Sequence, residues 1–236
     1  MRMRLNLDVF DLATRFGISK QLVSVVFNTW ICFLEKELSW VVSMPSQKTV
    51  WENMPESFKT LYPKTRAIID CFEIKIQKSK SLKAQAETYS SYKNANTVKI
   101  LAGIIPTGQF CFMSKAYGGR ISDREITVKS GFVNILDKGD DVMADRGFEI
   151  SDILLPLEIT LNKPPSTNRG KPLARADVDH TRRIASLRIH VERALGRLGN
   201  FTILQEVLPL TVAKQVDNII MVIAALCNMH SQLVRK

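Results

Sequence analysis

Two apolar stretches joined by a short turn constrain the fold of this chain most. They form the run NTVKILAGIIPTGQFCFMSKAYGG, residues 96–119, in which Pro-Thr-Gly separates two segments of strand character. This pattern predicts a β-hairpin, because the glycine lets the chain reverse within a few residues. Consecutive strands in a hairpin are antiparallel, which argues against a doubly wound dinucleotide-binding fold. The sequence also lacks the GxGxxG signature of that fold.

The segments around the hairpin predict a mixed α/β order. AIIDCFEIKI, residues 67–76, alternates and is rich in β-branched residues, and VMAD, residues 142–145, is a short strand. Residues 122–136 have a helical period with Ser122 as the cap, and two further helices are expected at 177–198 and 211–233. The run 154–173 predicts a strand followed by a long loop, because it is rich in Pro, Asn and Gly.

The first sixty residues are expected to be helical. Their apolar residues recur at spacings of three and four, the period of a buried helical face. In FGISKQ, Gly17 can take the positive φ of a tight turn and Ser19 can cap the next helix, so two helices meet at a turn. Three prolines then punctuate residues 41–66, which predicts a connector with at most one short helix.

The charge balance favours a polyanionic partner. The 236 residues include 33 Lys and Arg against 23 Asp and Glu, a formal net charge of +10. Such a surface attracts phosphates, most simply those of nucleic acid. The four cysteines are scattered without a CxxC pair, which argues against a zinc site or a disulfide framework and favours a reducing compartment.

No segment of the sequence predicts membrane insertion. The start, MRMRLNLDVFDLATRF, alternates charged and apolar residues and lacks the apolar centre of a signal peptide. The longest apolar run, IIMVIAALC, is well short of the roughly 20 residues that a spanning helix needs. We therefore expect a soluble intracellular protein with no membrane partner.

Three acidic residues lie at positions that suggest a role beyond that of ordinary surface charges. Asp70 lies inside the predicted strand 67–76, Asp145 ends the strand VMAD, and Glu192 lies on the arginine-rich helix. A carboxylate in a central strand loses hydration, which a bound cation would offset. Carboxylates from separate elements suit Mg²⁺ or Mn²⁺. Two such ions about 4 Å apart can activate a water and stabilise the leaving oxygen of a phosphodiester.

Five stretches, in this order, resemble a known family. IIDCFEI, YKNANTVKILAGIIPTGQF, AYGGRISDREI, DVMADRGF and TRRIASLRIHVERALGRL are similar to the DDE-type transposase domain of PIF/Harbinger elements and their domesticated nuclease relatives. The resemblance covers residues 68–236. The N-terminal run DLATRFGISKQLVSVVFNTWI resembles the helix-turn-helix that precedes this domain.

This resemblance implies an RNase H-like mixed sheet flanked by helices and preceded by a small helix-turn-helix region. It divides the chain into residues 1–66, the helix-turn-helix and connector, and residues 67–236, the nuclease domain. It implies a nuclear, metal-dependent DNA endonuclease or transposase, alone or with a separate DNA-binding partner protein or in an oligomer. The catalytic triad and ligands of Mg²⁺ or Mn²⁺ would be Asp70, Asp145 and Glu192.

Six residues are candidates for contacts with double-stranded DNA. The start of the second N-terminal helix would present Lys20, Gln21 and Ser24 to a groove. The arginine-rich helix would supply Arg182, Arg183 and Arg188. Because they lie on the same helix as Glu192, we expect these cationic side chains to contact DNA phosphates.

Several alternatives stay open from the residues alone. Asp123, in a Ser-Asp context typical of a helix start, is the rival to Asp145 as second catalytic acid. Asp145 itself suits a turn before Gly147, and Glu192 suits a surface pair with Arg188 one helical turn earlier. Glu73 is three residues from Asp70 and so points to the opposite face of the strand.

The alternative function is that of a domesticated, catalytically inactive transposase that acts as a DNA-binding protein. Gly199 stands where the family more often carries a lysine, and the chain starts close to the helix pair. Both departures favour this alternative, while the intact carboxylates favour an enzyme.

Overall fold

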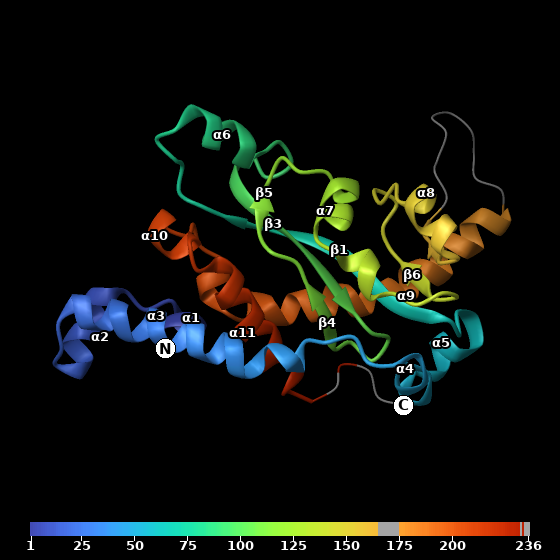
Figure 1. The fold of residues 1–236 in the computed structure, drawn as a ribbon, viewed down its shortest axis with the longest axis horizontal. Helices are drawn as coiled ribbons and strands as arrows, with labels where there is room; N and C mark the ends of the chain where they lie inside the picture. Colours follow the sequence, from blue (N-terminus) through green and yellow to red (C-terminus); the bar gives the residue numbers. More distant parts are fainter. Residues whose placement is uncertain (165–174, 232, 234–236) are drawn as a thin grey trace.

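The chain folds around strand β1, which runs from Thr65 to Lys75. The structure is a computed structural model that describes residues 1–164, 175–231 and 233, with the side chains of residues 175–180 outside the description (Figure 1). β1 contains the β-branched residues Thr65, Ile68, Ile69 and Ile74, and its first five residues are buried on both sides. The predicted strand 67–76 is therefore confirmed, beginning two residues earlier and ending one residue earlier.

The described strands form a seven-stranded mixed sheet in the order β2-β3-β1-β6-β7, with β4 and β5 paired to β3. β1 is antiparallel to β3 and parallel to β6, and β6 is parallel to β7. The predicted hairpin is confirmed as β3 and β4, and Gly108 in its turn has a φ of 88°. The remaining strands are β2 Tyr89–Ser90, β3 Ala95–Ile104, β4 Phe110–Met113, β5 Tyr117–Gly118, β6 Asp141–Met143 and β7 Thr160–Asn162.

Helices cover both faces of the sheet (Figure 1). α9 packs on β1 and β3 and α11 packs on β4, while α7 and α6 pack on β3. The α-helices are α1 Arg2–Leu5, α2 Val9–Phe16, α3 Lys20–Leu38, α4 Gln47–Asn53, α5 Glu56–Leu61, α6 Leu82–Thr88, α7 Asp123–Lys129, α8 Ser151–Leu154, α9 Arg175–Gly199, α10 Leu210–Ala213 and α11 Val216–Asn228. The 3₁₀ helices are η1 Ser39–Val41, η2 Phe132–Ile135, η3 Leu155–Leu157 and η4 Thr202–Leu204. The mixed α/β, RNase H-like fold is thereby confirmed.

The N-terminal helix-turn-helix is also confirmed. α2 ends at Gly17 with a φ of 64°, and the Ser19 side chain accepts a hydrogen bond from the backbone N–H of Leu22 at the start of α3. Leu12, Ala13 and Val23 form a small buried cluster between the two helices. α3 then lies along α11, which attaches this region to the sheet domain (Figure 1).

The main core extends from the sheet into residues before position 67. Ile31 of α3, Val50 of α4 and Phe58 of α5 belong to the same buried cluster as the strands. Phe58 is fully buried, so the connector contributes to the packing of the sheet domain. The division at residues 66 and 67 stays a prediction.

Three predictions of local structure were wrong in detail. The connector 41–66 contains two α-helices, because Ser46 caps α4 and Pro55 occupies the N-cap of α5, where a missing N–H is tolerated. Gly131, with a φ of 76°, separates η2 from α7. The C-terminal stretch is divided into α10 and α11. The long loop expected after β7 includes residues 165–174, which lie outside the described residues.

No single described helix has both the length and the apolar composition to cross a membrane. The bent pair Val9–Phe16 and Lys20–Val41 passes that test together, with a bend of 102°.

Candidate active site

The pairing of β1 with β6 brings Asp70 and Asp145 to one place. In the parallel register Ile68 lies opposite Met143. Asp70 follows Ile68 by two residues and Asp145 follows Met143 by two, so the two side chains leave neighbouring strands at the same level. The predicted strand VMAD is confirmed as β6, but it ends at Met143, so Asp145 lies two residues beyond the strand and not at its end.

Arg188 of α9 lies between these two carboxylates. Its Nη1 is 3.1 Å from Asp145 Oδ1, and its Nη2 is 3.9 Å from Asp70 Oδ2. The Arg188 side chain is only 12% exposed, and its Nε is buried without a hydrogen-bond partner among the described residues. The two acids therefore share one positive charge.

The environment of Asp70 disfavours its charged form. The pKa of Asp70 is raised to about 6, mainly by burial and to a smaller extent by the neighbouring carboxylates of Asp145 and Asp123. The hydrogen bond from the Cys71 backbone N–H (2.8 Å) and the charge of Arg188 oppose this rise. Asp145, with a side chain that is 54% exposed, is open to solvent and accepts a hydrogen bond from the backbone N–H of Arg146.

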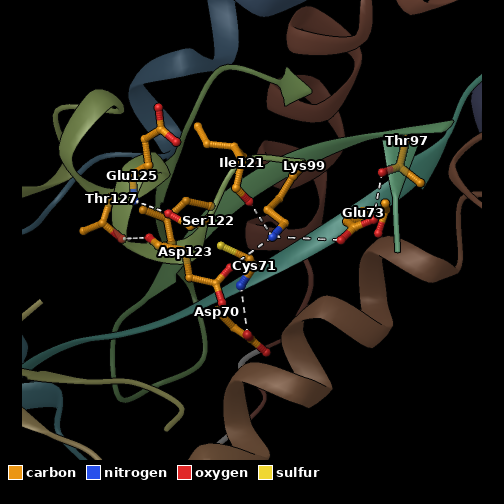
Figure 2. Close-up of polar contacts among 12 residues, drawn as sticks. Asp70, Cys71, Glu73, Thr97, Lys99, Ile121, Ser122, Asp123, Glu125 and Thr127 are labelled. Atoms are coloured by element: carbon orange, nitrogen blue, oxygen red, sulfur yellow. Dashed lines mark hydrogen bonds and ion pairs between the residues drawn. The ribbon is translucent and has the colours of Figure 1, made fainter. Parts of the chain in front are cut away.

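The opposite face of β1 carries a second cluster of charges (Figure 2). Lys99 of β3, which lies opposite Glu73 in the antiparallel register, donates to Asp123 Oδ1 (3.2 Å) and to the carbonyl of Ile121 (2.9 Å). Glu73 lies 4.0 Å from the same ammonium and accepts a 2.7 Å hydrogen bond from the Thr97 hydroxyl. Glu73 points away from Asp70, as the strand period predicts, and its charge is satisfied within the protein.

α7 places Asp123 beside the loop that carries Asp145. Ser122 caps α7 through the backbone N–H of Glu125, which confirms the predicted cap. A Cβ on Gly147 would lie 3.3 Å from Asp123 Oδ2, so this glycine lets the helix start and the loop approach closely. Asp123 thus occupies a structural position next to the site.

A turn also follows Asp145, as one of the alternatives expected. The Phe148 N–H donates to the Asp145 carbonyl at 3.1 Å. Arg124 of α7 forms two hydrogen bonds with Asp152 and one with the carbonyl of Glu149, and these bonds hold the chain after this turn against α7. Asp145 therefore both begins a turn and lies close to Asp70, so the two alternatives do not exclude each other.

Glu192 lies on α9 one turn beyond Arg188 and is exposed. α9 buries one face of its described part, with residues Ile184, Leu187, Val191, Ala194 and Leu198. The structure records no hydrogen bond or ion pair of Glu192 with any described residue, and the ion pairs of Arg188 are with Asp70 and Asp145. Glu192 as third member of the triad stays a prediction.

The donors at this site fit a hard divalent cation in part. Asp70 and Asp145 are oxygen ligands from separate elements, and the guanidinium between them shows that the pair is arranged to hold positive charge. Within the described part of the chain, no group of three or more His, Cys, Asp or Glu side chains could hold a metal ion.

The candidate DNA contacts lie at two places. Lys20, Gln21 and Ser24 are exposed in the first turns of α3, where the Lys20 ammonium lies 4.6 Å from the ring centroid of Phe10. Arg182 and Arg183 are exposed on α9, whereas Arg188 faces the carboxylates. Their predicted contacts with DNA stay predictions.

Lys99 and the bridging position of Arg188 were not predicted from the sequence. A lysine within an apolar strand, with an acid in the preceding strand, was a signal for Lys99. Which acids Arg188 meets depends on how α9 docks on the sheet.

Comparisons with known families agree with this geometry. Residues 69–228 match the family described as DDE superfamily endonuclease, a region that contains Asp70, Asp145 and Glu192. Residues 1–39 match the helix-turn-helix of DDE superfamily endonuclease and contain α2 and α3. No curated protein matches the chain. Since the endonuclease match covers well over half of the 236 residues, the chain belongs to the DDE superfamily of endonucleases.

Proposed function

We propose that this protein is a divalent-metal-dependent DNA endonuclease or transposase of the PIF/Harbinger type. The observation that carries the proposal is the meeting of Asp70 and Asp145, from distant parts of the sequence, within the region that matches the endonuclease family. The five sequence stretches that resemble PIF/Harbinger transposases support the subtype.

Asp70, Asp145 and Glu192 are the proposed ligands of Mg²⁺ or Mn²⁺, which members of this superfamily generally use. Bound there, such ions would activate a water or a DNA 3′-hydroxyl and stabilise the departing oxygen. The chain's own contribution is to gather the carboxylates: β1 and β6 position the first two by their register, and α9 supplies the third. Arg188 offsets part of the charge of the first two.

The remaining surface would position the duplex. Arg182 and Arg183 are exposed on the helix that carries Glu192, so they are available to contact phosphates of the bound duplex. The first turns of α3 would enter a groove with Lys20, Gln21 and Ser24. In this proposal residues 1–66 bind DNA and residues 67–236 cleave it, in the nucleus, with a separate DNA-binding partner protein or in an oligomer.

Nicking of supercoiled plasmid tests the proposal. The purified chain is expected to nick DNA in Mg²⁺ or Mn²⁺ and to lose this activity in EDTA. Asp145→Asn is expected to abolish nicking, while Glu52→Gln, which removes an exposed carboxylate from the α4 pair with Lys48, is expected to keep it. DNA binding without nicking by the parent chain in either metal would contradict the proposal and support the inactive DNA-binding alternative.

A binding readout distinguishes ligand loss from indirect loss of activity. Mn²⁺ is expected to raise the melting temperature of the parent chain, because a ligand that binds only the folded state stabilises it. Asp145→Asn and Glu192→Gln are expected to reduce this rise, and Asp123→Asn to keep it. The reverse result for Glu192 and Asp123 would show that the third ligand is assigned to the wrong acid.

A further inference from the structure

A cavity of about 680 Å³ lies between the segment 77–94, which contains α6, and strands β1, β3 and β5. Its volume is within the roughly 300–1,000 Å³ typical of ligand sites. The residues that matter for its chemistry are Lys78, Tyr89, Tyr92, Asn96, Lys99 and Arg120. Apart from Lys99, none of them has a part in the site described above.

The cavity has an excess of positive charge. The segment 77–94 carries four lysines and one glutamate. Lys78 and Arg120 line the cavity, and neither side chain has a hydrogen bond or ion pair with a residue that the structure describes. The acid in the wall, Glu73, is already satisfied by Thr97 and Lys99. The uncompensated cations therefore favour an anionic ligand.

Two exposed tyrosines stand beside these cations. Tyr92 is 82% exposed and Tyr89 is 49% exposed, although large aromatic side chains normally bury their rings. The Lys93 ammonium lies 4.9 Å from the ring centroid of Tyr92. Exposed aromatic rings interspersed with lysines are the arrangement on which unpaired bases stack while cations contact the backbone phosphates.

The walls of the cavity are held in place by direct contacts. Asn96 Nδ2 donates to the carbonyl of Gln85 (3.0 Å) and to the hydroxyl of Thr88 (2.8 Å), which ties the end of α6 to β3. A Cβ on Gly118 would overlap the carbonyl of Glu87, and one on Gly119 would overlap the hydroxyl of Thr97. The cavity is thus formed before any ligand binds.

One side chain of the cavity wall reaches toward the loop that carries Asp145. Lys99 lines the cavity and donates to Asp123, and Asp123 lies beside Gly147 of that loop. The cavity itself lies on the face of β1 opposite Asp70.

We propose that this cavity binds an unpaired segment of the DNA substrate, with bases stacked on Tyr92 and Tyr89 and phosphates near Lys78 and Arg120. The proposal rests on the proposed function in that it takes DNA as the substrate. An intact duplex does not fit this role, because its base faces are hidden in the stack and cannot meet the tyrosine rings.

Fluorescence anisotropy with the full chain tests the proposal in EDTA, where no cleavage occurs. The probe is a labelled oligothymidylate of about ten nucleotides, within the range of single-strand sites. Tyr92→Ala is expected to weaken its binding about tenfold, while Tyr92→Phe keeps the stacking ring and stays within about twofold of the parent. Trp40→Ala, which removes an exposed aromatic residue from η1, is the matched control and is also expected to stay within about twofold.

Charge variants and competitors complete the test. Lys78→Gln and Arg120→Gln are each expected to lower the salt dependence of oligothymidylate binding by about 0.7 in the log–log slope. Duplex DNA of the same length is expected to bind Tyr92→Ala as well as it binds the parent. These charge variants also keep the test decisive if Tyr92→Ala fails to fold.

Four results would overturn the proposal. They are no binding of oligothymidylate by the parent at low salt, parent-like binding by Tyr92→Ala, an equal loss of duplex affinity, and displacement of the probe by polyglutamate as efficient as by unlabelled strand. If the parent chain binds the strand through Tyr92 but never nicks plasmid, the proposed endonuclease function is contradicted, whereas the proposed strand-binding site is still supported.

Discussion

The two faces of β1 use carboxylates in opposite ways. On the face toward α7, Glu73 and Asp123 share Lys99, and further hydrogen bonds from Thr97 and to the carbonyl of Ile121 complete the cluster. On the face toward α9, Asp70 and Asp145 have one arginine between them, and Asp145 is half exposed. Glu73 and Asp123, whose charges are satisfied inside the protein, support the fold. Asp70 and Asp145, whose charges are only partly compensated, are available to a cation from solution.

Cleavage rates should separate the two faces most strongly. Asp70→Asn is expected to slow metal-dependent plasmid nicking by at least about a thousandfold, equivalent to about 4 kcal/mol, because metal ions contribute several kcal/mol to such reactions. Glu73→Gln, on the same strand, keeps the hydrogen bond from Thr97 and is expected to change the rate less than about threefold. Similar losses in both variants would show that the faces are not functionally distinct.

The free energy of unfolding should depend more on the face toward α7 than on the face toward α9. Lys99→Met leaves Glu73 and Asp123 without their shared cation and is expected to lower the free energy of unfolding by about 3–5 kcal/mol. Lys129→Met removes an exposed lysine from the pair with Glu125 on α7 and is the control, with no measurable change expected in urea denaturation. A Lys99→Met chain as stable as the parent would mean that this cluster contributes nothing to the fold.

The pH dependence of stability gives a smaller effect with a defined sign. The pKa of Asp70 is about 6 in the folded chain against 3.8 in the reference state, so the folded state binds its proton more tightly. The stability that Asp70 contributes is therefore complete below about pH 4 and is lost as the pH rises through 6. Relative to the parent, Asp70→Asn in EDTA is expected to gain stability over this range, by at most about 3 kcal/mol.

Urea unfolding of both chains between pH 4 and pH 8 measures this difference. Glu52→Gln, on exposed α4, is the control and is expected to show a flat difference across the same range. A flat difference for Asp70→Asn as well would show that burial does not disfavour the Asp70 carboxylate.

Much of the sheet was predictable because its signals are local. β1, the β3–β4 hairpin and the Ser19 and Ser122 caps all depend on residues within a few positions of one another. α6 was not predicted because none of its residues is buried, so no apolar period marks it. α4 and α5 were missed because prolines that precede helices were taken as marks of a connector.

Of the candidate site, only the acidic residues could be predicted from the sequence. Asp70 and Asp145 stood out as charges at strand positions, and parallel pairing brings them together. The match of Lys99 to Glu73 depends on the antiparallel register between β1 and β3, which no local pattern reports. The position of Asp123 beside Gly147 depends on how α7 packs against a loop distant in sequence.

The glycine pair in the wall of the cavity limits how this protein can change. Neither Gly118 nor Gly119 has room for a side chain, so a substitution at either position would displace that wall. Natural divergence or laboratory selection can alter what the cavity accepts more easily from the opposite side, through the exposed lysines and tyrosines of residues 77–94. Variation concentrated in that segment, with the glycine pair retained, is the pattern by which related chains would acquire different strand preferences.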